Sequence, residues 1–305
     1  MITIYKKPRR YTMKFASCSV EGKNIGICIV MENGVRPLND ILGIQVDGLY
    51  ELIENWNDMR PEITKKAEGV AIIPIEKVKF ETPVRVPKRN LICVGKNYLE
   101  HARELEGQTS TISGVPTSPI FFSKMAYETI GPNENIEFNT SVTNEVDYEV
   151  ELAVFIGKYA KNITEAEAED VIFGYTISND VSARNLQVEH VQWHKGKSLD
   201  TFSPIGPVVV TKDEFQYPPK LKIECLVNDE LRQSGYTDDL IFSLSKLVST
   251  LSQGMTLIPG DIILTGTPSG VGMGFNPPKY LKNGDVVTCR IEGIGTLVNG
   301  VVTKN

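Results

Sequence analysis

The strongest constraint on the fold is the texture of the chain from Leu91 onward, where short apolar runs are separated by Gly, Pro and Asn. Such runs, bounded by turn residues, predict β-strands. Strands are expected at residues 91–95, 119–123, 149–157, 171–177, 206–210, 221–227, 261–266 and 285–291. Helical periodicity is confined to about 99–106, 165–170, 184–191 and 242–251. Because strands and helices do not alternate regularly, a Rossmann or TIM-type layout is disfavoured, and a strand-dominated α+β fold is predicted.

The residues before Leu91 predict a separate, smaller unit. Two strand patterns, 14–20 and 24–31, are followed by helical patterns at 49–57 and 60–68. We therefore expect a small α+β N-terminal domain over 13–82 and a larger domain over 91–305. The segment 83–90, PVRVPKRN, is typical of a linker because it carries two prolines and two arginines. Residues 1–12, ahead of a strand-like opening at Met13, are expected to be a flexible extension.

Composition narrows the class of protein. The net charge of −6 and the pI near 5.3 argue against a nucleic-acid partner, which usually demands a broad basic face. No run of eighteen apolar residues is present, and the N-terminus lacks the apolar core of a signal peptide, so no membrane partner is expected. The five cysteines are scattered without a CxxC pair, which predicts buried free thiols in a cytoplasmic protein.

The segment 146–157, VDYEVELAVFIG, places acidic residues on one face of a predicted strand. Asp147, Glu149 and Glu151 alternate with apolar residues, so their side chains point the same way. Glutamates at i and i+2 have Cα atoms about 6.5–7 Å apart, close enough for both carboxylates to bind one cation. The alternative is an ordinary solvent-exposed strand face. Against it, residues 153–156 are apolar on both faces, which predicts a strand buried on both sides.

A third acid, Asp180, ends the apolar run in 173–187, FGYTISNDVSARNLQ. A helix is expected to start at Val181 or Ser182, so Asp180 can either cap that helix or reach a metal ion. Three carboxylates make a hard oxygen site, suited to Mg²⁺, Mn²⁺ or Ca²⁺ rather than zinc.

His101 and Glu104 lie three residues apart in a predicted helix, so the carboxylate can orient the imidazole as a general base. An ordinary surface pair is the alternative. The polar stretch 107–119 that follows is a candidate lid. His190 and His194 have metal-binding spacing but no accompanying acid pattern, and we expect no site there.

Lys197, in 196–207, is a candidate to neutralise a carboxylate or a developing enolate, although most lysines are solvent-exposed charges. The turn 264–272, LTGTPSGVG, exposes backbone N–H groups that suit an anion. Its spacing is not that of a Walker or dinucleotide loop.

Taken in order, these motifs resemble the fumarylacetoacetate hydrolase (FAH) family. The motifs are VGKNYLEHARELEG, DYEVELAVFIG, GYTISNDVSARNLQ, GKSLDTFSPIGP and GMTLIPGDIILTGTPSGVG, which together cover most of residues 91–272. Residues 13–80 resemble the small N-terminal domain of a bacterial branch that includes oxaloacetate decarboxylases. The resemblance implies a mixed β-sandwich roll for the catalytic domain and a homodimer.

The same resemblance implies one Mg²⁺ or Mn²⁺ per subunit on Glu149, Glu151 and Asp180. It implies that His101 and Glu104 are a water-activating dyad and that Lys197 lies close to metal and substrate. Gln187 and Thr267 match substrate contacts, and Thr201 matches a threonine near a second cation in some members.

These inferences predict metal-dependent cleavage of a carbon–carbon bond in a small 2-oxo acid. Oxaloacetate decarboxylation is favoured, with acylpyruvate or fumarylpyruvate hydrolysis a close second. Isomerisation of a hydroxy-dienoate is third, and a non-catalytic protein that binds a 2-oxo acid or a partner remains an alternative.

Overall fold

A computed structural model describes residues 13–106 and 114–304, so the expected extension at 1–12 and most of the candidate lid lie outside the described residues. The strands are β1 (Lys14–Val20), β2 (Lys23–Met31), β3 (Gly34–Pro37), β4 (Ile73–Pro74), β5 (Val78–Phe80), β6 (Leu91–Gly95), β7 (Ile120–Lys124), β8 (Ile136–Asn139), β9 (Val146–Asp147), β10 (Val150–Ile156), β11 (Ile172–Asn179), β12 (Ser182–Ala183), β13 (Ile205–Thr211), β14 (Lys222–Val227), β15 (Glu230–Tyr236), β16 (Ile262–Leu264), β17 (Val286–Ile291) and β18 (Gly295–Lys304).

The α-helices are α1 (Leu38–Leu42), α2 (Gly48–Glu54), α3 (Trp56–Lys66), α4 (Leu99–Glu104), α5 (Ala168–Val171), α6 (Arg184–Glu189), α7 (His194–Lys197) and α8 (Leu244–Ser252). Short 3-10 helices are η1 (Ala67–Gly69), η2 (Ile75–Lys77), η3 (Glu165–Glu167), η4 (Lys212–Glu214) and η5 (Gly272–Gly274). The predicted strand-dominated α+β fold is confirmed.

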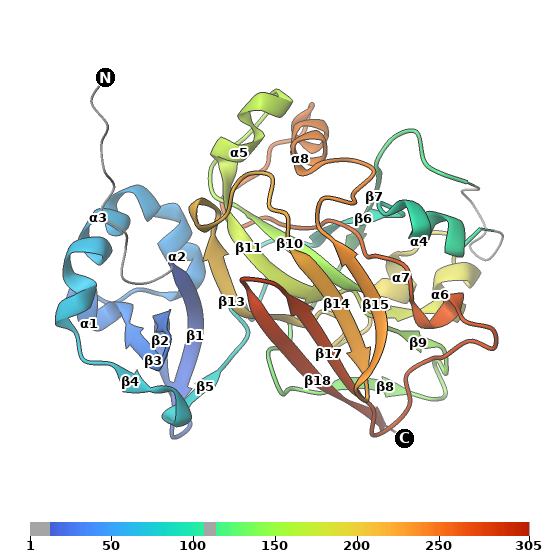
Figure 1. Cartoon of the computed structure of the whole chain (residues 1–305), viewed down its shortest axis with the longest axis horizontal. Coiled ribbons are helices and arrows are strands. Elements are labelled where there is room, and N and C mark those ends of the chain that lie inside the picture. The colour runs from blue at the N-terminus through green and yellow to red at the C-terminus, as the bar shows by residue number, and fades with distance from the viewer. Residues whose placement is uncertain (1–12, 107–113, 305) are drawn as a thin grey trace.

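Two mixed sheets form the frame of the molecule (Figure 1). The larger sheet runs β4-β3-β2-β1-β13-β11-β10-β16-β6-β7, with β5 also paired to β1. The smaller sheet runs β15-β14-β17-β18-β8. In the larger sheet, β1 pairs antiparallel with β13 at Lys14↔Val210 and Phe15↔Val209. Strands from both predicted domains therefore share one sheet, and the division at 83–90 stays a prediction.

The central strand β10 divides the interior into two hydrophobic cores. Alternate residues Val150, Leu152, Val154 and Ile156 face a core shared with the smaller sheet and α8. Ala153 and Phe155 face a second core, shared with α1, α2 and α3. This β-branched and aromatic strand is buried on both faces, as its apolar run predicts.

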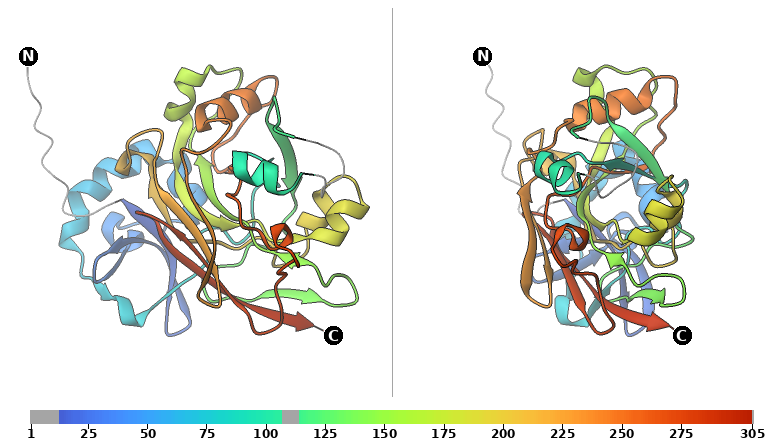
Figure 2. Two further views of the ribbon diagram at one scale, coloured as in Figure 1. Left: turned by 45° about the vertical axis from the view of Figure 1, so that its right-hand side comes forward. Right: turned by 90° about the vertical axis from the view of Figure 1, so that its right-hand side faces the viewer.

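The helices cover different ends of the larger sheet. In Figures 1 and 2, α1–α3 lie at the end formed by β1–β4, while α4, α6 and α7 lie near the opposite end. The longest α-helix described after Leu91, α8, is amphipathic: Leu244, Leu247, Val248 and Leu251 are buried, and the Ser243 side chain caps its N-terminus by accepting a hydrogen bond from Lys246 N.

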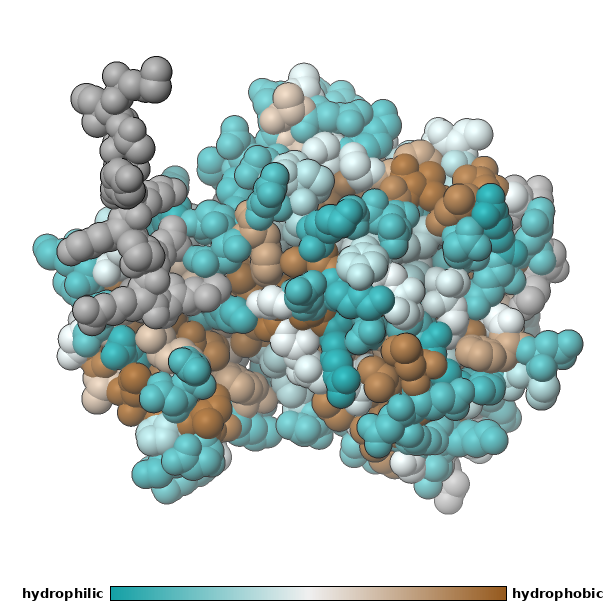
Figure 3. Space-filling model, viewed as in Figure 1, coloured by the Kyte–Doolittle hydropathy of each residue, from teal (hydrophilic) through white to brown (hydrophobic). Residues whose placement is uncertain are grey.

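The surface seen in Figure 3 is hydrophilic with small, separate hydrophobic patches. None of the helices in the described chain has the length and apolar character needed to cross a bilayer. The five cysteines are buried and unpaired, as predicted.

Candidate metal centre and active site

The three predicted metal ligands converge in the structure. Oxygen atoms of Glu149, Glu151 and Asp180 lie within 4.8 Å of one another, and all three residues are buried. Burial contradicts the alternative of a solvent-exposed strand face. Two oxygens held by one Mg²⁺ are about 3 to 4.2 Å apart, so small movements of the side chains would gather the three carboxylates around an ion.

The antiparallel pair β10–β11 brings these residues together. Val150 at the start of β10 is paired with Asn179 at the end of β11. Next to the Val150–Asn179 pair, two hydrogen bonds hold Glu149 beside Asp180. Asp180 N donates to Glu149 O at 2.8 Å, and Glu149 N donates to Asn179 Oδ1 at 2.9 Å. Helix α6 begins only at Arg184 and has no side-chain cap, so the expected helix start at Val181 or Ser182 is wrong. Residues Ser182 and Ala183 instead form β12, paired with β9.

Buried lysines hold the Asp180 carboxylate. Lys197 Nζ donates to Glu149 Oε2 and to Asp180 Oδ2, each at 2.8 Å. Lys124 Nζ, at the end of β7, donates to Asp180 Oδ1 at 2.6 Å and to Val181 O at 2.8 Å. Burial opposes the charge on Lys197, but Asp180 and Glu149 outweigh it and raise the lysine pKa. For Lys124 the burial prevails, and its pKa is lowered.

Arg184 joins Glu149 to a second buried acid. Its Nη2 lies 2.7 Å from Glu149 Oε1 and forms an ion pair with it, although the geometry is not that of a hydrogen bond. Its Nε donates a hydrogen bond to Asp147 Oδ2 at 2.8 Å. Asp147 also accepts the N–H groups of Gly272 and Met273 at 2.6 and 2.9 Å. Burial alone would raise the pKa of Glu149, but Lys197 and Arg184 dominate and lower it to about 2.

Glu151 is the carboxylate that no cationic side chain balances within the described residues. Its Oε2 accepts from Gly266 N at 2.7 Å. Burial, followed by the charges of Asp180 and Glu149, raises the pKa of Glu151 well above its usual value. Asp147, Glu149 and Asp180 thus pair with Lys124, Arg184 and Lys197, whereas Glu151 has no ion pair among the described residues; a further buried lysine, Lys96, lines the same cavity. The unpaired Glu151 carboxyl group and the all-oxygen donor set fit a hard divalent cation.

The turn that holds Glu151 requires glycine. Gly266 has φ 104°, and a Cβ there would lie 2.8 Å from Cβ of Asn97. The Asn97 side chain in turn donates to Thr265 O at 2.9 Å, which fixes the turn after β16.

The two residues of the predicted dyad are in contact. His101 Nδ1 lies 3.2 Å from Glu104 Oε2, and the imidazole is buried on α4. Glu104 Oε1 accepts from Gly270 N at 2.9 Å, so the 264–272 turn contacts the dyad as well as the metal centre. Because Nδ1 faces the carboxylate, Nε2 is the nitrogen left to act as a base.

One cavity of about 20 Å³ joins the dyad to the acidic cluster, room for roughly one water molecule. It is lined by Val94, Gly95, Lys96, His101, Leu105, Phe122, Glu149, Glu151, Arg184, Gln187, Trp193, Lys197 and Thr267. The predicted substrate contacts, Gln187 and Thr267, are therefore both on its wall. Their roles, like that of the dyad, stay predictions.

Other candidates lie elsewhere. Thr201 Oγ1 accepts a hydrogen bond from the backbone N–H of Glu137 at 2.8 Å. Thr201 does not line the cavity. His190 follows α6 and His194 opens α7, where its Nδ1 contacts Ser123 O at 3.0 Å. Among the described residues they belong to no group that could hold a metal.

Two buried cations of the site, Lys124 and Arg184, are not among the residues predicted from the sequence. Both are charged residues completely buried beside acids, Lys124 at the end of the apolar run 119–123 and Arg184 at the start of a helix. A lysine that directly follows an apolar run was the available signal, since a charge buried there is almost always paired.

Comparisons with known proteins agree with this geometry. Residues 90–302 match the family described as fumarylacetoacetate (FAA) hydrolase C-terminal. The chain is 48% identical over 233 residues to oxaloacetate tautomerase YisK of Bacillus subtilis, covering 76% of each protein.

Solved structures are similar over nearly the whole chain. A fumarylacetoacetate hydrolase from Exiguobacterium antarcticum has a TM-score of 0.82 at 37% identity, covering 96% of this chain and all of that one. Maleylpyruvate hydrolase from Sphingobium sp. SYK-6, in complex with manganese(II) and pyruvate, has a TM-score of 0.78 at 30% identity with the same coverage. The buried acidic cluster, the dyad and these similarities place the chain in the fumarylacetoacetate hydrolase family.

Proposed function

We propose that this protein is a divalent-metal-dependent enzyme that acts on oxaloacetate, interconverting its keto and enol forms. The observation that carries the proposal is the convergence of buried Glu151, which within the described chain accepts only from Gly266 N, with Glu149 and Asp180. The similarity to an oxaloacetate tautomerase supports the substrate, and a structural relative in complex with manganese and pyruvate supports the metal.

Glu149, Glu151 and Asp180 would hold one Mg²⁺ or Mn²⁺ per subunit. A bound cation of this kind polarises the carbonyl of a 2-oxo acid and stabilises the negative charge of its enolate. Lys197 and Lys124 hold the Asp180 carboxylate in place through ion pairs of 2.8 and 2.6 Å.

The dyad supplies the proton transfer. His101 Nε2 would take a proton from the CH₂ carbon beside the oxo group and return it to the oxo oxygen, which gives the enol, while Glu104 orients the ring and stabilises the imidazolium between the two transfers. Gly270 N fixes Glu104 in turn. Gln187 and Thr267 on the cavity wall position the carboxylate and oxo oxygens.

Decarboxylation, favoured by the sequence analysis, is the second candidate because loss of CO₂ from oxaloacetate gives the enolate of pyruvate at the same site. It needs no base to open the reaction. Hydrolysis of an acylpyruvate differs again, since His101 must then activate water.

Three assays with Mg²⁺ or Mn²⁺ separate these reactions. Tautomerisation is followed by the ultraviolet absorbance of enol-oxaloacetate, decarboxylation by pyruvate formation, and hydrolysis by loss of acetylpyruvate. We expect tautomerisation to be accelerated most, and a Glu149→Ala/Glu151→Ala variant to lose it. A wild-type protein that accelerates none of the three, or a double variant that keeps full activity, would refute the proposal.

Binding can be tested without turnover. Mg²⁺ with oxalate, which resembles a chelating 2-oxo acid, should raise the melting temperature, since a ligand bound only by the folded state stabilises it. A non-catalytic binding protein would show this shift without activity. We also propose a homodimer, which sedimentation velocity tests directly.

A further inference from the structure

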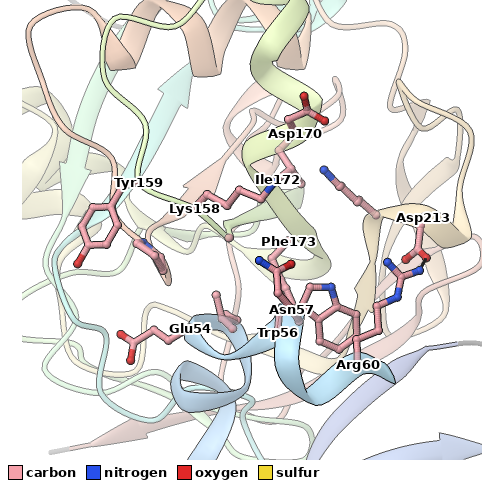
Figure 4. Close-up of a pocket in the computed structure, with 14 residues that line it drawn as sticks. Glu54, Trp56, Asn57, Arg60, Lys158, Tyr159, Asp170, Ile172, Phe173 and Asp213 are labelled. Atoms are coloured by element: carbon pink, nitrogen blue, oxygen red, sulfur yellow. Dashed lines mark hydrogen bonds and ion pairs between the residues drawn. The ribbon is translucent and has the colours of Figure 1, made fainter. Parts of the chain in front are cut away.

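A second, larger cavity lies where the helices of the N-terminal part meet the larger sheet (Figure 4). Its volume is about 600 Å³, within the range of small-molecule sites. Its walls come from α3, from the chain that follows β10, from the start of β11 and from η4. None of the residues assigned to the metal centre or the dyad lines it.

The floor of this cavity is aromatic. Trp56 of α3 packs edge-to-face against Phe173, with ring centroids 5.2 Å apart, and against Phe15 at 5.7 Å. Figure 4 shows Trp56 and Phe173 side by side, with the Lys158 side chain extending toward the space above them. Tyr159, 75% exposed, stands at one side. Such a floor suits a flat apolar group.

The cavity wall carries three cations and three carboxylates, but its two lysines form no ion pair among the described residues. Arg60 pairs with Asp213, and Glu54 pairs with Lys88 outside the cavity, so these charges are balanced. Within the described chain neither Lys158 nor Lys212 forms an ion pair, and Lys212 Nζ donates to the carbonyl of Glu169. Asp170 is the one remaining carboxylate on the wall. Burial, and then the charge of Lys158, lowers the pKa of Lys212, while Asp170, Glu169 and Asp213 partly oppose the shift.

We propose that this cavity binds a small aromatic monocarboxylate, with its carboxylate between Lys158 and Lys212 and its ring on Trp56. The site is distinct from the metal centre. Glu151 is the second residue of β10, and Lys158 follows its far end, so the two sites are about 20 Å apart along the strand.

The two tryptophans allow a direct test, because Trp193 lines the active-site cavity and Trp56 lines this one. In a Trp193→Phe protein with Mg²⁺ present, phenylacetate is titrated and the fluorescence of Trp56 is followed. We expect saturable binding with a Kd on the order of 1 mM or tighter. Phenylacetamide, which has the same ring without the charge, should bind at least about tenfold more weakly.

Lysine variants in this Trp193→Phe background decide whether the charges are responsible. Lys158→Gln and Lys212→Gln should each weaken phenylacetate binding about tenfold. Lys161→Gln, an exposed lysine of the same loop that does not line the cavity, should leave it unchanged. Unchanged melting temperatures would confirm that the variants are folded.

The proposal is overturned if Trp56 fluorescence does not respond to phenylacetate. It is also overturned if phenylacetamide binds as well, or if both cavity variants bind as tightly as Lys161→Gln. None of these outcomes depends on turnover at the metal centre, so failure of the proposed oxaloacetate chemistry would be seen separately.

Discussion

At the scale of single residues, two glutamates two positions apart have opposite electrostatic surroundings. Glu149 contacts Lys197 and Arg184, whereas Glu151 accepts only a backbone hydrogen bond among the interactions described here. Neutralising each should therefore affect the metal-free protein differently. Glu151→Gln removes a buried like charge, and we expect the free energy of unfolding to stay constant or to rise by about 1 kcal/mol.

Glu149→Gln should instead lower the free energy of unfolding by about 2–4 kcal/mol, because two buried cations lose a partner. Urea unfolding in a chelator measures both variants. Both should also lose the rise in melting temperature that Mg²⁺ gives the wild type. Equal destabilisation by the two substitutions would contradict the charge distribution described above.

The dyad gives a second residue-scale prediction. His101→Ala should lower kcat for oxaloacetate tautomerisation by about 10²–10⁴-fold, the usual contribution of a general base. Decarboxylation, which needs no base to begin, should lose less. Glu100→Gln on the same helix, an exposed residue paired with Arg103, is the matched control and should retain activity. Equal loss of both reactions in His101→Ala would count against the division of roles.

At the scale of elements, the sequence predicted the strands that are apolar over several consecutive residues. The expected strand at 91–95 coincides with β6, and those at 171–177 and 206–210 differ from β11 and β13 by one or two residues. The strand β15 was missed because it has few apolar residues, and it lies at the edge of its sheet with Leu231 exposed and Gln233 buried. Pairing with β14 decides its structure, and pairing is not visible in a local pattern.

The same limit applied to the site. Spacing along one strand predicted that Glu149 and Glu151 share a face, but it gave no reason to place Lys124 beside Asp180. That contact joins the end of β7 to the residue after β11, which are separated by β10, β16 and β6 in the sheet order. Such long-range contacts follow from topology, for which the family resemblance was the only guide.

The predicted linker 83–90 is held by ion pairs, which yields an element-scale prediction. Arg89 contacts Asp261 through both its Nε, at 2.8 Å, and its Nη2. The Asp261 side chain is only 2% exposed, and it also accepts from Ile258 N at 2.8 Å just before β16. Arg89→Met should lower the free energy of unfolding by about 1–2 kcal/mol, since Arg89 is 42% exposed and water partly screens the pair.

Arg103→Met, in an exposed pair with Glu100, is the control and should cost little. A double-mutant cycle with Asp261→Asn would isolate the coupling, which should be favourable. If Arg89→Met were no more destabilising than Arg103→Met, the ion pair would contribute nothing to holding the linker.

At the scale of the whole molecule, the small N-terminal part and the catalytic part are joined by more than the linker. β1 pairs with β13, and one hydrophobic core contains Leu38 and Leu52 together with Phe155 of the central strand. Trp56 of α3 packs on Phe173 of β11. Separating the two parts would expose all of this apolar surface, at about 25 cal/mol for each Å².

We therefore expect a single cooperative unfolding transition despite the two predicted domains. Each tryptophan reports on one part, so Trp56→Phe leaves Trp193 as the probe of the catalytic part and Trp193→Phe leaves Trp56 as the probe of the N-terminal part. Within each variant, urea transitions followed by tryptophan fluorescence and by far-ultraviolet circular dichroism should share one midpoint. If Trp56 responded at lower urea than the circular dichroism, the N-terminal part would unfold independently. The shared sheet would then be a docking surface between two domains rather than a common core.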